Sequence, residues 1–160
     1  MIRMTMGLVV LAAMAWAGIA RAQQFNDASN LAEAVGMVKM TEHTSGVMRN
    51  FCVQHYPALA SFIDTDLQRW RVRESRVLDQ VERHWRALEA QGMEGDEILS
   101  DGTRAVLSDM AFIARLAAVE PGESVEGYCR RSFDDLAAGA WRRRTPHAYG
   151  FLDQVIASYP

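Results

Sequence analysis

The chain has 160 residues, of which 49% are hydrophobic and 23% are charged, with a formal net charge of -3. This is the composition of an ordinary folded protein, and it excludes a disordered chain, a collagen and a polytopic membrane protein. The length suffices for one domain with a hydrophobic core and is too short for two.

The first 22 residues have the pattern of a secretory signal peptide. Arg3 gives the start a positive charge, an apolar run of 13 residues extends from Gly7 to Ile19, and Ala20-Arg21-Ala22 matches an A-x-A cleavage site. The run is shorter than the roughly 20 residues that span a bilayer, although an uncleaved membrane anchor is the alternative. We predict cleavage between Ala22 and Gln23, a periplasmic or secreted location, no stable membrane insertion after cleavage, and a single helical domain over 23–160.

The charge balance argues against nucleic acid and anionic membranes as partners. Loss of Arg3 and Arg21 would reduce the 17 basic residues to 15, against 20 acidic residues, for a net charge of -5. An acidic protein of this kind is a poor ligand for nucleic acid or an anionic membrane. We therefore expect the partner to be another envelope or extracellular protein, and no nucleic acid.

Cys52 and Cys129 are the two cysteines of the chain. An even number in an exported protein predicts one disulfide, with two buried free thiols as the alternative. A metal site was also considered, because Cys52 and His55 are three residues apart and Glu42-His43 lies upstream, but a third and a fourth ligand lack matching spacing. The sequence predicts neither a metal nor a cofactor.

Five stretches show the spacing of amphipathic helices, and no stretch alternates like a strand. The predicted helices cover about 29–55, 58–91, 101–119, 124–141 and the residues from 146 onward. Ser29 or Asn30 is expected to cap the first, and Thr44-Ser45-Gly46 to break or bend it. The predicted fold is all-α: a four- or five-helix bundle with one long central helix and one disulfide.

The stretch 58–91 has the clearest pattern. Its apolar residues recur every three or four positions and predict one continuous helix of seven or eight turns: Ile63, Leu67, Trp70, Val77, Val81, Trp85 and Leu88. In the last stretch, Thr145 followed by Pro146 is the signal of a capped first turn.

Glu74 lies on this apolar stripe, between Trp70 and Val77. A carboxylate on an apolar face needs a partner or a function, so Glu74 with the adjacent Arg73 is the candidate buried polar site. One interpretation is a general base or ligand contact in a bundle pocket, and the other is a structural ion pair.

Arg142, Arg143 and Arg144 end the fourth stretch and form a candidate patch for an anion or a partner, with a solvated helix end as the alternative. Tryptophans are frequent at binding hot spots, so Trp70, Trp85 and Trp141 could line a pocket or an interface. Trp70 and Trp85 lie on the apolar stripe, and for these two we expect packing in the core. No residues are assigned as catalytic, because no motif of a known nucleophile or metal centre is present.

Two resemblances add to this picture. The run Cys52-x4-Pro57, followed by Trp70 and a second cysteine far downstream, resembles a loose group of small, uncharacterised periplasmic helical proteins of proteobacteria, which has no assigned activity. The run Arg73 to Leu78 is similar to the Arg-Glu-x-x-Val-Leu run of exported helical chorismate mutases, and implies arginines around a dicarboxylate substrate. In that family a lysine shortly precedes the run, whereas Lys39, the only lysine here, lies 34 positions before Arg73.

The sequence thus leads to two functional hypotheses. The first is an exported, non-enzymatic protein-binding factor of the inhibitor, immunity or envelope accessory type. The second is a small helical enzyme or small-molecule binder that uses Glu74 and nearby arginines, with a chorismate mutase-like activity as its remotest form. An enclosed polar cavity at Glu74 would favour the second hypothesis, and a packed ion pair the first.

Overall fold

A computed structural model describes residues 27–119, 122 and 124–158, and the predicted signal peptide lies outside these residues. The described chain is helical throughout and contains no strand. Its elements are α2 (Leu31–His55), the 3-10 helix η1 (Pro57–Leu59), α3 (Ala60–Arg73), α4 (Ser75–Ala90), α5 (Gly95–Val119), α6 (Val125–Ala137), α7 (Ala140–Arg144) and α8 (Pro146–Ser158). The predicted all-α bundle is confirmed, and the five predicted stretches correspond to seven α-helices because two of them are divided.

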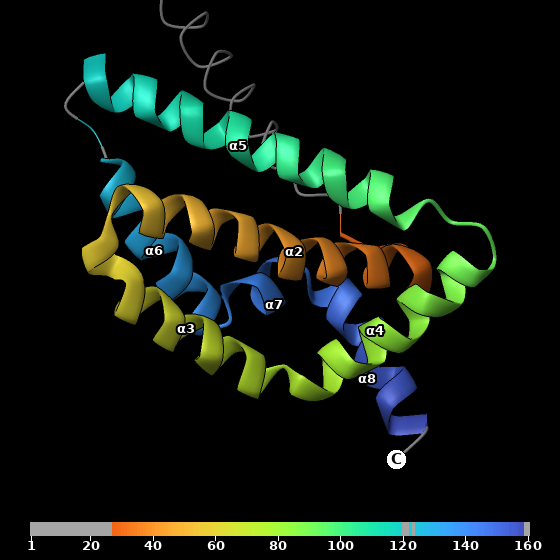
Figure 1. Ribbon diagram of the computed structural model, residues 1–160. Helices are drawn as coiled ribbons and strands as arrows, with labels where there is room; N and C mark the ends of the chain where they lie inside the picture. The colour runs from red at the N-terminus through yellow and green to blue at the C-terminus, as the bar shows by residue number, and fades with distance from the viewer. Residues whose placement is uncertain (1–26, 120–121, 123, 159–160) are drawn as a thin grey trace, which may run out of the picture.

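The long central helix of the bundle is α2, which packs against α3, α4, α5, α6 and α8. Figure 1 shows α5 along one side of α2, and α3 and α4 along the other. The expected break at Thr44-Ser45-Gly46 is wrong, because α2 is continuous through it. The hydroxyls of Thr44 and Ser45 donate to the carbonyls of Met40 and Glu42 on the preceding turn, so they do not compete with the helix.

The stretch 58–91 is not one helix, because it is divided at Glu74. There the backbone has φ -98° and ψ 12°, so α3 ends and α4 begins in a new direction. The predicted stripe is nevertheless buried on both sides of the break, from Ile63 to Trp85. The apolar spacing therefore identified the buried face correctly and missed the change of direction.

The other boundaries show where local signals were misread. Helix α5 begins at Gly95, six residues before the predicted start, after a turn in which Gly92 has φ +97°. A second turn, at Gly139 with φ +76°, divides the fourth stretch into α6 and α7. Only glycine adopts these backbone angles without strain.

Helix α8 begins at Pro146 as predicted, but Thr145 does not cap it. The Thr145 hydroxyl donates to the carbonyl of Trp141, while the carboxylate of Asp27 accepts from the backbone N–H groups of His147 and Ala148 at 2.7 and 3.0 Å. A residue about 120 positions away thus supplies the N-terminal hydrogen bonds of α8, whereas Asn30 caps its own helix α2 as expected.

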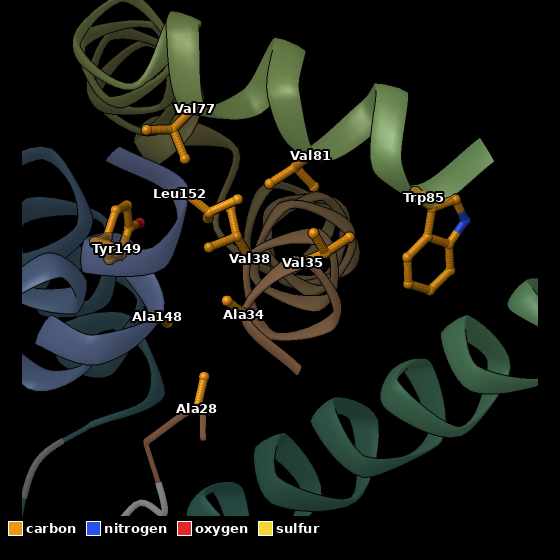
Figure 2. Close-up of a cluster of buried hydrophobic side chains, with 10 residues drawn as sticks. All are labelled: Ala28, Ala34, Val35, Val38, Val77, Val81, Trp85, Ala148, Tyr149 and Leu152. Carbon is orange, nitrogen blue, oxygen red and sulfur yellow. The ribbon is translucent and has the colours of Figure 1, made fainter. Parts of the chain in front are cut away.

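The core consists of two clusters. In the first, Val77, Val81 and Trp85 of α4 meet Val35 and other residues of α2, together with side chains of α8 (Figure 2). The second cluster lies between α2, α3, α5 and α6 and surrounds the Cys52–Cys129 disulfide, whose presence confirms the predicted pairing.

Candidate functional site

Glu74 is 2% exposed, and both of its carboxylate oxygens are bound within the chain. Oε1 accepts from Nε of Arg73 at 2.9 Å, and Oε2 accepts from Nη2 of Arg142 at 2.8 Å. The structure therefore pairs Glu74 with Arg73, as predicted, and also with Arg142, which the sequence analysis had placed in a separate candidate patch. This satisfies the charge of a carboxylate that would otherwise be costly to bury.

The two arginines also bind other groups. Arg73 donates to the carbonyls of Leu136 and Ala137, and Nη1 of Arg142 donates to Asp153 at 2.6 Å. Burial works against the charge of Arg142, but its bonds to Glu74 and Asp153 outweigh burial and raise its pKa above the ordinary value. The network thus joins the α3–α4 break to α6, α7 and α8.

Tyr149 completes the surroundings of this network. The guanidinium of Arg142 lies over its ring, 4.4 Å from the centroid. Burial, assisted by the negative charge of Glu74, raises the pKa of Tyr149 to about 12. Glu74 and Arg73 line neither of the two clefts described below, so the candidate polar site is a packed ion network and not a ligand pocket.

The cluster Arg142, Arg143 and Arg144 is likewise divided among intramolecular partners. Arg143 donates to the carbonyl of Ala138 at 2.7 Å, and Arg144 donates to Asp135 at 2.9 Å. A partner of this patch would have to compete with these bonds. The structure therefore gives it no support as an anion site.

The residues considered for a metal site are held in other ways. Cys52 is bonded to Cys129, so it cannot act as a thiolate ligand, and Nε2 of His43 lies 2.7 Å from the hydroxyl of Thr103. The described part of the chain has no group of three His, Cys, Asp or Glu side chains that could hold a metal ion. Within the same residues, no helix is long and apolar enough to cross a bilayer.

Helix α5 carries a surface that the sequence analysis missed. Its main contacts are with α2 and α6, and no other described helix packs extensively against its opposite side. Ile98 and Phe112 are 38% and 54% exposed there, and they account for two of the four exposed large hydrophobic side chains among the described residues. On this side of α5, exposed residues recur every three or four positions from Ile98 to Phe112. We call this set the outer stripe, and its members are Ile98, Asp101, Ala105, Ser108 and Phe112.

The end of α5 at which the outer stripe begins is acidic. Glu94, Asp96, Glu97 and Asp101 lie within eight residues of one another. A hydrogen bond that the protonated Glu97 donates to Glu94, together with the charge of Asp101, raises the pKa of Glu97. By helical periodicity, Ile98 and Phe112 lie on a different side of α5 from the inward residues Val106, Met110 and Ile113. This difference could have identified the surface from the sequence.

Compared with protein-family models, with curated proteins and with solved structures, the chain shows no match.

Proposed function

We propose that this protein is exported and acts as a binding factor that recognises another protein through the outer stripe of α5. The observation that carries the proposal is the exposure of Phe112 and Ile98 on a long helix whose opposite face is anchored to the bundle. Aromatic and aliphatic side chains presented by a rigid helix are frequent anchors of protein interfaces.

Export is supported by two features that are independent of each other. The first 22 residues have the charge, length and cleavage pattern of a signal peptide. The disulfide between Cys52 and Cys129 belongs to an oxidising compartment, because thiols in the cytosol are kept reduced.

The outer stripe also limits the chemistry of the partner. Ile98 and Phe112 are 14 residues apart, which corresponds to about 21 Å along a helix. Asp101 lies between them and is paired with Arg104 at 3.0 Å, whereas Glu94, Asp96 and Glu97 are close to Ile98 in the sequence. The complementary surface is therefore a groove with two apolar pockets and basic residues beside one of them.

The competing hypothesis of a small enzyme that uses Glu74 has less support. A general base must reach its substrate, whereas Glu74 is 2% exposed and both of its oxygens are paired with arginines. A dicarboxylate substrate would need arginines with free donors, and those of Arg73 and Arg142 are bonded to carbonyls and carboxylates.

The test is a comparison of three immobilised variants against the envelope extract of the producing cell. Phe112→Ser and Ile98→Ser remove the two anchors of the outer stripe. Val72→Ser is the matched control, because Val72 is 64% exposed but lies on α3. Bound proteins are identified by mass spectrometry, and their affinity for the purified chain is then measured.

The proposal predicts a stoichiometric partner that the wild type and Val72→Ser retain and that both α5 variants lose, with affinity at least tenfold weaker, or about 1.4 kcal/mol. Its association should slow as salt is added, since the stripe begins among carboxylates. Equal retention by all variants would remove α5 from the interface.

A further inference from the structure

A groove lies between α2, α5 and the run of α6, α7 and α8. It consists of two adjoining clefts of about 410 and about 360 Å³, and Thr41, Thr44 and Trp141 line both of them. On α2 the lining extends from Gly36 to Met48, a length of about 18 Å. Each cleft has the size of a site for a small molecule.

One end of the groove is apolar. Met37, Met40 and Val38 of α2 face Tyr149 of α8 there, and Trp141 separates this end from the other cleft. Methionine side chains are flexible and adapt to ligands of irregular shape. This end therefore suits the hydrocarbon part of a ligand.

Four of the seven hydroxyl groups that line the groove are acceptors towards a ligand. Those of Thr41, Thr44, Ser45 and Thr145 donate their hydrogens to carbonyls of their own helices, at 2.7 to 2.9 Å. A hydroxyl that has donated its hydrogen retains only its lone pairs for other partners. A ligand that forms hydrogen bonds with these four hydroxyls must bring its own donors.

The charged residues at the other end carry no net formal charge. Two arginines and two aspartates line it: Arg131, Arg144, Asp109 and Asp135. Arg144 is paired with Asp135 at 2.9 Å, and the guanidinium of Arg131 lies 5.6 Å from the ring centroid of Tyr128. Asp109 forms no ion pair with the residues that the structure describes, so its carboxylate adds another acceptor.

We propose that this groove binds an apolar molecule that carries a protonated amine. The ammonium group donates to the oxygens of Thr41, Thr44 and Asp109, and the hydrocarbon part lies along Met37, Met40 and Tyr149. Such a group occurs in an alkylamine and at the N-terminus of a short apolar peptide. The proposal goes beyond the partner surface of α5 and does not depend on it.

Calorimetric titration of the purified protein with eight-carbon compounds tests which head group the groove prefers. Octylammonium, octanoate and octanol differ only there, and we expect octylammonium to bind at least tenfold more tightly than either of the others. Octyltrimethylammonium keeps the charge but has no N–H donor, so its affinity should be at least fivefold lower than that of octylammonium. Trileucine amide and its N-acetylated form distinguish a peptide source, because only the first has the ammonium.

Two glycines of α2 provide matched variants that test whether the probe binds in the groove. A Cβ at Gly36, which lines the apolar end, or at Gly46, which lines neither cleft, meets no atom within 4 Å. Gly36→Leu should reduce octylammonium binding at least tenfold, while Gly46→Leu, with the same gain in helix propensity, should leave it unchanged. Equal loss in both variants, no loss in either, no binding of octylammonium, or octanoate binding as tightly would each overturn the proposal.

Discussion

Nη2 of Arg142 lies 2.8 Å from Oε2 of Glu74, and this ion pair joins residues that are 68 positions apart in the chain. Arg73 takes the other oxygen of the same carboxylate. The contact explains how a charge can lie at a break between two helices of the core, since the break directs Glu74 towards the short helix α7. The charge network therefore determines how α3 and α4 meet the C-terminal helices.

Replacement of Glu74 by Gln should destabilise the fold. The variant leaves Arg73 and Arg142 without their common anion, and we expect a loss of about 2 to 4 kcal/mol, below the value for a fully buried pair because both arginines are more than a third exposed. Urea unfolding measures it. The control is Glu126→Gln, which breaks the exposed Arg130–Glu126 pair and should cost less than about 0.5 kcal/mol. Equal losses in the two variants would contradict a structural role for Glu74.

The disulfide should contribute strongly to stability because it closes a loop of 77 positions. In the chain-entropy model a loop of this length is worth about 4 kcal/mol. The paired replacement of Cys52 and Cys129 by Ala should lower the free energy of unfolding by about that amount. Untreated protein should also resist alkylation until it is reduced, and the finding of two reactive thiols would disprove the bond.

Asp27 should make stability depend on pH at the acid end. Burial opposes its ionisation, but backbone hydrogen bonds from His147, Ala148 and Ala28 outweigh burial and lower its pKa. Its contribution is therefore complete above the unfolded pKa of about 3.9 and is lost as the pH falls through the folded value. We expect Asp27→Asn to cost about 1 kcal/mol at neutral pH and much less below pH 3. A difference that is constant across this range would exclude the ionised cap.

Tyr149 should make stability depend on pH at the alkaline end. Burial raises its pKa to about 12, so the unfolded chain, with a pKa of about 10, loses this proton first. Stability should accordingly decline as the pH rises from about 10 to 12, and Tyr149→Phe should decline less steeply. The ultraviolet absorbance of phenolate measures this ionisation directly. The absorbance change near pH 12 should be absent from Tyr149→Phe.

Trp70 lies in the core and Trp141 at its edge, and the two should respond differently to replacement by alanine. Trp70 is 1% exposed, and Trp70→Ala should lower stability by about 3 to 5 kcal/mol. Trp141 is only partly buried and borders both clefts, so Trp141→Ala should cost about 1 to 2 kcal/mol. Thermal and urea unfolding of both variants should agree on this order.

Periodicity alone predicted the fold class and most of the core. The stripe from Ile63 to Trp85 is buried as expected, because burial depends on the spacing of apolar residues and tolerates an error in helix continuity. The break at Glu74 was not predictable in this way, because it depends on Arg142, far away in the sequence. The same reason applies to the cap of α8. Local sequence rules predicted Thr145 as the cap, but the carboxylate of Asp27, far away in the sequence, accepts the hydrogen bonds instead.

The candidate site was predicted less well. The sequence correctly identified Glu74 as unusual, yet the choice between a pocket and an ion pair required the positions of α7 and α8. The groove beside Trp141 depends on side chains of five helices and has no local motif. Exposed Phe112, by contrast, was recognisable, because it lies off the inward face of its own helix.

The Cys52–Cys129 bond closes a covalent ring that includes α3, α4 and α5. A protease that cuts the backbone once between these cysteines opens the ring but releases no fragment. Nicked protein should therefore migrate as one species on a non-reducing gel and separate into two only after reduction. Helix α5, which we propose binds the partner, lies between the two cysteines. A single cut on either side of it therefore leaves it attached to the molecule through the disulfide.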